Sequence, residues 1–200
     1  MIKLYGSGQS RSFRALWALE EAQVAFEYVE VTRDMLASET YQKLNPQGKI
    51  PTLVDDDLVL TESAAIVSYA ASCSDHELVP ENRHARAQYD DMCYFVMTDF
   101  EQPLWTIGKH RFALPEEHRR EAVIDTARWE FAKSQDALLQ RMANRNFAVG
   151  DQFSMADVLL AQTLNWALRF EMDVDSTLVA YRDRQYERAA CEASLKKIGA

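Results

Sequence analysis

The hydrophobic positions of the first thirty residues follow two different periods. Ile2–Tyr5 and Phe26–Val31 alternate apolar and polar side chains, as half-buried strands do. From about Arg11, apolar residues recur three or four positions apart, which predicts a helix between the two strands. A strand–helix–strand unit this short implies that the two strands run parallel in one sheet.

A hairpin and a second helix are predicted next. Thr52–Val54 and Leu58–Leu60 are short apolar runs on either side of three aspartates, which is typical of two strands and a tight turn. A helix is predicted from Ser63 to about Ser72. The preceding segment, Ser38–Leu44, shows no clear period and is expected to be less regular.

Beyond residue 83 every periodic stretch is helical. Residues 76–83 are polar and contain a proline, so they are the predicted linker between two domains. Ser154 followed by Asp157 forms a capping-box pattern, which marks the start of one helix. The helices expected here are His84–Ile107 with a kink at Pro103, Pro115–Met142, Ser154–Phe170, Thr177–Tyr186 and Ala189–Lys197.

Composition excludes several classes of protein. Of the 200 residues, 48% are hydrophobic, enough for a packed core, yet no run approaches the roughly 18 apolar residues of a membrane span. The net charge of −9 argues against non-specific nucleic-acid binding. The chain opens directly on a strand-like run without a signal-peptide pattern, so a cytoplasmic protein is expected. Neither the three cysteines nor the four histidines have metal-ligand spacing, and no metal is expected.

A proline corner stands before the hairpin. Pro51 has no N–H to give to a sheet and it biases Ile50 toward an extended backbone. If the Ile50–Pro51 bond were cis, the corner would leave the Ile50 backbone free to pair with an extended ligand. The sequence leaves the isomer open, because only about 5–6% of X–Pro bonds are cis.

Serines stand at two predicted helix starts. Ser63 follows Glu62 at the start of the second helix, and Ser10 and Ser12 lie at the start of the first. Serines at such places often act only as caps. A helix start also attracts anions, and a hydroxyl there can stabilise a ligand thiolate. The two starts are therefore candidate binding positions.

Three motifs together resemble the cytosolic glutathione S-transferases. Asn45–Pro51 reads Asn-Pro-Gln-Gly-Lys-Ile-Pro, and two strands later Thr61–Ile66 reads Thr-Glu-Ser-Ala-Ala-Ile. The capping box of Ser154 is similar to one in the helical domain of that family. The stretch Tyr181–Ser194 resembles the family's usual ending, except that Ala189 stands where proline is usual. The chain is similar to bacterial members with a serine-type active-site loop.

This resemblance implies an α/β N-terminal thioredoxin-like domain of order βαβαββα and an all-α C-terminal helical domain. The first, residues 1–75, would bind glutathione, and the second would span residues 84–200. The resemblance also implies roles for site residues. Ser10 would stabilise the thiolate, with Ser12 and Tyr5 as alternatives, and Arg11 stands where one bacterial branch has a cysteine. The remaining glutathione contacts implied are Lys49, Ile50, Pro51, Glu62 and Ser63.

The function implied is that of a glutathione transferase. Glutathione would be the co-substrate, its thiolate would attack hydrophobic electrophiles or peroxides in detoxification, and the protein would be a homodimer. Two alternatives stay open. One is a non-catalytic scaffold or regulator with the same fold, and the other is a glutathione-dependent isomerase or disulfide reductase.

Overall fold

The computed structural model describes all of residues 1–200, and the chain divides into two compact units. Unit 1 contains Met1–Val79 and Tyr186–Ala200, and unit 2 contains Pro80–Gln185. The boundary after Val79 falls inside the linker predicted at residues 76–83. The last fifteen residues, grouped with the helical domain in the sequence analysis, make their contacts with unit 1 instead. None of the helices in the structure has the length and apolar character needed to cross a membrane.

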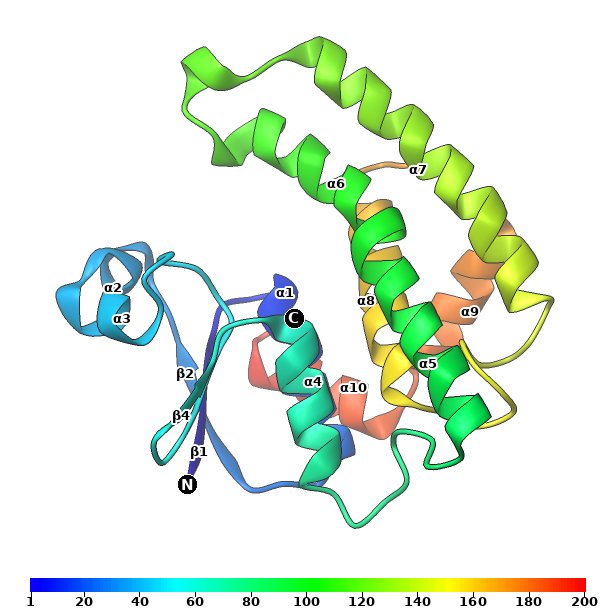
Figure 1. Cartoon of the computed structure of the whole chain (residues 1–200). Helices are drawn as coiled ribbons and strands as arrows, with labels where there is room; N and C mark the ends of the chain where they lie inside the picture. The colour runs from blue at the N-terminus through cyan, green and yellow to red at the C-terminus, as the bar shows by residue number, and fades with distance from the viewer. The chain divides into compact units, whose positions relative to one another are not determined.

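Unit 1 is built on a four-stranded sheet in the order β2-β1-β3-β4 (Figure 1). Strand β2 is parallel to β1, whereas β3 runs antiparallel to both β1 and β4. The strands and helices of this unit are β1 Ile2–Gly6, α1 Arg11–Glu21, β2 Phe26–Glu30, α2 Arg33–Ala37, α3 Glu39–Leu44, β3 Thr52–Asp55, β4 Leu58–Leu60, α4 Ser63–Ser72 and α10 Ala189–Lys197. The sheet and helices confirm the fold class expected from the sequence.

The core of unit 1 lies between the sheet and helices α1 and α4. Leu4 and Leu53 pair across the two central strands and have no exposed surface. Helix α1 packs against α4 and α10. Its burial extends around most of the helix, and Trp17 and Leu16 are fully buried. The apolar period read from the sequence therefore belongs to a helix with neighbours on several sides.

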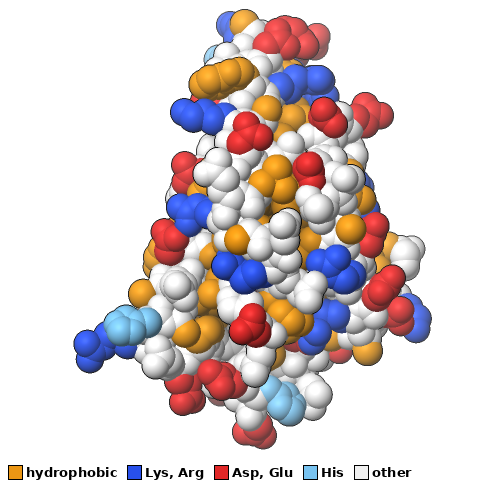
Figure 2. All heavy atoms as spheres, turned by 90° about the vertical axis from the view of Figure 1, so that its right-hand side faces the viewer, with side chains coloured by type: hydrophobic (Ala, Val, Ile, Leu, Met, Phe, Trp, Pro, Cys, Tyr) orange, Lys and Arg blue, Asp and Glu red, His pale blue; other side chains and the backbone are white.

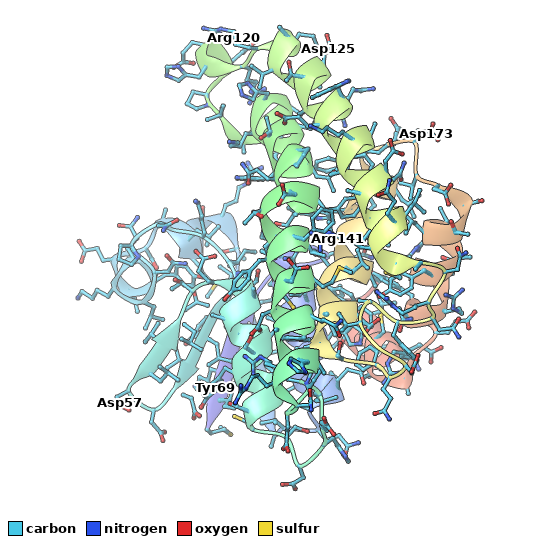
Figure 3. All side chains as sticks on the ribbon, turned by 45° about the vertical axis from the view of Figure 1, so that its right-hand side comes forward. Asp57, Tyr69, Arg120, Asp125, Arg141 and Asp173 are labelled. Carbon is cyan, nitrogen blue, oxygen red and sulfur yellow. The ribbon has the colours of Figure 1, made fainter.

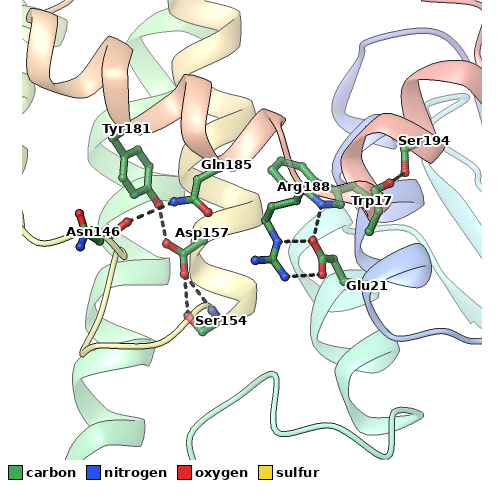
Figure 4. A network of polar contacts seen from close by, with 10 residues as sticks. Trp17, Glu21, Asn146, Ser154, Asp157, Tyr181, Gln185, Arg188 and Ser194 are labelled. Carbon is green, nitrogen blue, oxygen red and sulfur yellow. Dashed lines mark hydrogen bonds and ion pairs between the residues drawn. The ribbon is translucent and has the colours of Figure 1, made fainter.

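Helix α10 is tied to α1 by an ion pair. The guanidinium of Arg188 donates to both carboxylate oxygens of Glu21, at 2.6 and 2.8 Å, and Trp17 Nε1 donates to Glu21 Oε1 at 2.9 Å (Figure 4). The Glu21 side chain is only 7% exposed. A carboxylate so buried needs these three donors, because an unpaired buried charge is strongly destabilising.

The segment expected to be less regular is helical. Ser38–Leu44 contains helix α3, and helix α2 precedes it. Both helices begin at a hydroxyl cap: Thr32 accepts from the Met35 N–H and Ser38 accepts from the Tyr41 N–H, each at 3.3 Å. The apolar pattern gave no helical period here because Tyr41 is the one buried residue of the two helices, whereas the order βαβαββα implied by the resemblance does place a helix between β2 and β3.

Unit 2 consists of helices. They are α5 Arg83–Phe95, α6 Glu101–Gly108, α7 Glu121–Met142, α8 Met155–Arg169 and α9 Ser176–Tyr186, the last of which ends at the boundary with unit 1. Two π-helical segments, η1 Val96–Phe100 and η2 Lys109–Ala113, follow α5 and α6, and η3 Glu116–His118 is a 3-10 turn. Helix α8 lies at the centre, with almost every residue buried.

Two helix boundaries in unit 2 differ from the sequence prediction. The helix predicted as His84–Ile107 is divided into α5 and α6 by the π segment η1, which lies just before Pro103. Pro103 has no N–H to donate to the carbonyl four residues earlier. The preceding turn is wider than an α-helical turn, because the Glu101 N–H donates to the Val96 carbonyl five residues back. The helix predicted from Pro115 begins only at Glu121, because Pro115 starts the short 3-10 turn.

The capping box of α8 is confirmed and forms a buried network. Asp157, which is not exposed, accepts from the backbone N–H groups of Ser154 and Ala148 at 2.8 and 2.7 Å. The Tyr181 hydroxyl on α9 donates to it at 2.7 Å (Figure 4). Burial raises the pKa of Asp157, and these hydrogen bonds act in the opposite direction. Asp157 therefore joins the start of α8 to helix α9.

Helices α5 and α7 are joined by a second contact within unit 2. Arg141 on α7 forms an ion pair with Asp91 on α5, and its guanidinium lies 4.5 Å from the centre of the Phe95 ring (Figure 3).

On the face shown in Figure 2, acidic and basic side chains are intermingled with small hydrophobic areas. Charge on this face is therefore mixed, although the whole chain carries a net charge of −9.

Candidate functional site

The register of the sheet brings three loops of unit 1 to one edge. Tyr5, near the end of β1, pairs with Thr52 at the start of β3, so the loop after β1 and the proline corner before β3 lie together. Leu60 at the end of β4 pairs with Leu53, which places the start of α4 at the same edge. The candidate positions that are separated in the sequence are thus gathered by strand pairing.

Ser10 is the N-cap residue of α1. Its backbone is extended, and its Oγ accepts from the Ser12 N–H at 3.2 Å. The side chain is half-buried. Since the first N–H groups of a helix carry partial positive charge, a ligand anion beside Ser10 would be stabilised both by the helix start and by the hydroxyl.

Ser12 lies behind Ser10 and is fully buried. Its Oγ lies 2.6 Å from Ser10 Oγ and accepts from the Ser7 N–H at 3.0 Å. A Cβ at Gly6 would stand 2.6 Å from the Ser12 Cβ, so only glycine lets Ser12 approach the end of β1 so closely. Burial separates Ser12 from solvent, in contrast to Ser10.

Tyr5 belongs to the other face of the sheet from Leu4. Its ring packs edge-on against the Tyr41 ring of α3, with the ring centres 5.9 Å apart. Successive residues of a strand point to opposite faces, so Tyr5 shares its face with Lys3, and Leu4 shares the opposite face with Ile2. Tyr5 is half-buried at this contact with α3.

The proline corner is fixed by α3. The Ile50–Pro51 peptide is cis, which decides the isomer that the sequence left open. The Lys49 carbonyl accepts from the Tyr41 hydroxyl at 2.7 Å and from the Asn45 amide at 2.8 Å. Burial raises the pKa of Tyr41 and outweighs its hydrogen bond with Thr52, so the hydroxyl stays a neutral donor.

Sequence reasoning did not identify Tyr41 and Asn45 as supports of this corner. They lie four residues apart at the end of α3 and share one side of that helix. The spacing was available in the sequence, but this helix was implied only by the order βαβαββα, and the apolar pattern gave no bounds for it. The Lys49 side chain is exposed, and its ammonium donates to Gln47 Oε1 at 3.0 Å.

The start of α4 presents one exposed and one buried residue. Glu62 is the N-cap position, its side chain makes no capping hydrogen bond, and it is exposed. Ser63 is the first helical residue and is 3% exposed. The helix bounds Ser63–Ser72 are those predicted. An exposed carboxylate beside a helix start can meet a ligand ammonium, while the helix start can meet a carboxylate.

Family models match both parts of the chain. "Glutathione S-transferase, N-terminal domain" matches residues 1–72, and "Glutathione S-transferase, C-terminal domain" matches residues 101–188.

Individual relatives agree with these matches. A glutathione S-transferase of Triticum aestivum is 32% identical over 180 residues, covering 86% of this chain and 81% of its own. Glutathione S-transferase GST-4.5 of Xanthomonas campestris is 27% identical and covers 99% of each chain. The solved theta class glutathione S-transferase of Xanthomonas axonopodis pv. citri, with glutathione bound, is 30% identical, covers 96% of each chain and has a TM-score of 0.78. The present chain is a member of the glutathione S-transferase family and has a glutathione transferase function.

Proposed function

We propose that this transferase is of the serine type, with Ser10 as the group that stabilises the glutathione thiolate. The observation that carries this proposal is the position of Ser10 as the half-buried cap of α1, at the sheet edge where the three loops meet. Lowering a thiol pKa by about two units requires about 2.7 kcal/mol. A hydroxyl hydrogen bond to an anion supplies roughly 1.5–3 kcal/mol of that and a helix start about 0.3–1.

The alternatives to Ser10 have less favourable positions. Ser12 is fully buried behind Ser10, and direct contact with a ligand sulfur would require the loop to move. The Tyr5 ring is packed against Tyr41 on the sheet face opposite to Leu4. Both observations support the choice of Ser10.

The other positions at this edge match the two ends of glutathione. Ser63 and the start of α4 would hold the γ-glutamyl carboxylate, and Glu62 would meet the α-ammonium group. The Ile50 backbone at the Pro51 corner would pair with the cysteinyl backbone, and Lys49 would meet the glycine carboxylate. The exposure of Glu62 and Lys49 supports these assignments, because both charges can reach a ligand from solvent.

The chemistry at this site is positioning and thiolate stabilisation. Unit 1 would hold glutathione so that its sulfur anion attacks a hydrophobic electrophile or the oxygen of a peroxide. Residues 1–75 would form the glutathione-binding domain and residues 84–200 the helical domain, of which the last fifteen residues pack within unit 1. A role in detoxification and a cytoplasmic location fit such a reaction.

We also propose a homodimer. Three large hydrophobic side chains of the helical unit, Tyr94, Phe112 and Trp129, are 60–69% exposed. Exposed aromatic residues of this kind are enriched at protein interfaces. The first domain is small and buries little surface by itself, which also favours association.

Calorimetric titration with glutathione, followed by a substrate panel, tests the proposal. The protein should bind glutathione and turn over an aryl halide or cumene hydroperoxide. Mixed disulfides and maleylacetoacetate belong in the same panel, and activity confined to either would favour a disulfide reductase or an isomerase. A folded protein that binds no glutathione would contradict the proposal and favour a scaffold with this fold.

A further inference from the structure

The two serine hydroxyls at the start of α1 form one hydrogen-bonded pair. Ser10 Oγ and Ser12 Oγ are 2.6 Å apart, which is short for a neutral O–H···O contact. The Ser12 hydroxyl has two other contacts, both with Ser7: its oxygen accepts from the Ser7 N–H at 3.0 Å and lies 3.4 Å from the Ser7 carbonyl oxygen. The Ser12 proton therefore has two acceptors within reach.

Two arrangements of the protons of this pair agree with these contacts. In the first, Ser10 donates to Ser12, and Ser12 donates to the Ser7 carbonyl across the long 3.4 Å contact. In the second, Ser12 donates to Ser10 across the 2.6 Å contact. The Ser10 oxygen then accepts from both the Ser12 hydroxyl and the Ser12 N–H, so its own proton is directed away from Ser12.

We propose that Ser12 is a positioning residue that acts through Ser10. This inference rests on the proposed role of Ser10 at the glutathione thiolate. A sulfur anion beside Ser10 attracts the Ser10 proton and so selects the second arrangement, in which Ser12 gives its proton to the Ser10 oxygen. No proton leaves either serine; each hydroxyl only turns about its Cβ–Oγ bond.

The surroundings of Ser12 hold its hydroxyl in a fixed position next to the Ser10 hydroxyl. Ser12 is fully buried, its oxygen is held by the Ser7 N–H, and Gly6 leaves just enough room for its side chain. A hydroxyl that accepts a hydrogen bond is a stronger donor, by about 10–30% per bond in condensed-phase estimates. Ser12 should thus make Ser10 a better donor to the thiolate than an isolated serine would be.

The test is the pH midpoint of thiolate formation in bound glutathione, followed by ultraviolet thiolate absorbance. Ser12→Ala should raise this midpoint by about half a unit, which corresponds to roughly a threefold loss of thiolate well below the midpoint. Glutathione affinity should change by less than about twofold, since the anchors at α4 and Lys49 are untouched. Ser194→Ala is the matched control, because Ser194 is also a fully buried serine of unit 1 and donates to a backbone carbonyl at 2.8 Å.

A double substitution separates positioning from a merely structural effect. If Ser12 acts through Ser10, adding Ser12→Ala to Ser10→Ala should shift the midpoint no further. An equal shift in both backgrounds, or no shift in either, would overturn the inference. If Ser12→Ala does not fold, Ser12→Cys replaces it; its weaker donor should give a shift in the same direction, and a midpoint equal to the original protein would overturn the inference.

The failure of the proposed function has a different signature. If Ser10→Ala alone leaves the midpoint unchanged, the role of Ser10 is wrong and the inference falls with it. If Ser10→Ala raises the midpoint while Ser12→Ala does not, only the role of Ser12 is wrong.

Discussion

Two adjacent residues at the start of α4 differ in exposure but are expected to hold the same end of glutathione. Glu62→Ala and Ser63→Ala should each weaken glutathione binding about ten- to hundredfold, because loss of a charge-assisted contact costs about 1.5–3 kcal/mol. Glu62 is exposed and makes no capping hydrogen bond, so its removal should leave the free energy of unfolding nearly unchanged. Calorimetric titration measures the affinity and chemical denaturation the stability.

Glu39→Ala provides the control for this pair of variants. Glu39 is an exposed glutamate in the first turn of α3, so it matches Glu62 in charge and in its place near a helix start. Its removal should leave glutathione affinity unchanged. Unchanged affinity in both the Glu62 and Ser63 variants would remove the γ-glutamyl assignment.

The three cysteines should react at different rates. Burial raises the pKa of Cys191 to about 12 and that of Cys93 to about 12, whereas Cys73 is exposed. Since thiolates are the reactive form, a thiol reagent at pH 8 should modify exposed Cys73 fastest, half-buried Cys93 more slowly and buried Cys191 only after unfolding. Mass spectrometry of the labelled protein checks this, and fast labelling of Cys191 in the folded protein would contradict it.

The same pKa shifts predict how stability depends on pH. In the folded protein Cys93 and Cys191 keep their protons up to about pH 12, while in the unfolded chain they lose them near the ordinary value of 9.0. The native state therefore binds more protons in this window, and the free energy of unfolding should fall as pH rises from about 9 to about 12. Replacing both cysteines by alanine should flatten the fall measured by denaturation in that range.

At the scale of single elements, the stability of helix α8 depends most on one buried side chain, that of Asp157. Asp157→Ala would remove the acceptor for Ser154, Ala148 and Tyr181 together and leave these donors buried without partners. It should lower the free energy of unfolding by roughly 3 kcal/mol or more, since each buried donor left without an acceptor costs about 1–3 kcal/mol. Tyr181→Phe removes one hydrogen bond to a carboxylate and should cost about 1.5–3 kcal/mol. Equal stabilities of the original protein and the Asp157 variant in urea would refute this account of the capping box.

Elements with strong local signals could be predicted from the sequence, and the others could not. Helix α4 and the capping box of α8 follow from a serine start and a dense apolar pattern. Helix α3 was implied by the order βαβαββα but not by the local pattern, because burial of Tyr41 alone gives no period. The π segment before Pro103 depends on how α5 and α6 stay continuous through the proline, which a linear pattern does not encode.

The candidate site shows the same division between local and long-range information. Ser10 and Ser63 could be placed because helix starts are local features of the sequence. The contact of Ser12 with Ser10 depends on how Gly6 and Ser7 fold back over the helix start. Likewise, the gathering of three loops at one edge depends on the antiparallel register of β3, which pairs residues some fifty positions apart.

For the whole molecule, the proposed homodimer gives a simple expectation. Light scattering at micromolar concentration should report twice the 22.9 kDa mass of the chain. Replacing Trp129, an exposed aromatic residue on α7, by glutamate should shift the population toward monomer, because a buried unpaired charge is costly at an interface. A mass near 22.9 kDa for the unmodified protein would contradict the dimer.

The most direct test of the serine mechanism is the pH midpoint of thiolate formation in glutathione bound to the whole protein, with and without Ser10. The account predicts that Ser10→Ala raises this midpoint by one unit or more and lowers turnover at neutral pH, while glutathione affinity changes little. The size of this shift follows from the hydrogen bond to sulfur, which contributes about 1.5–3 kcal/mol, because one pKa unit corresponds to about 1.36 kcal/mol. An unchanged midpoint in Ser10→Ala, together with a raised midpoint in Tyr5→Phe, would contradict the account and make this a tyrosine-type enzyme.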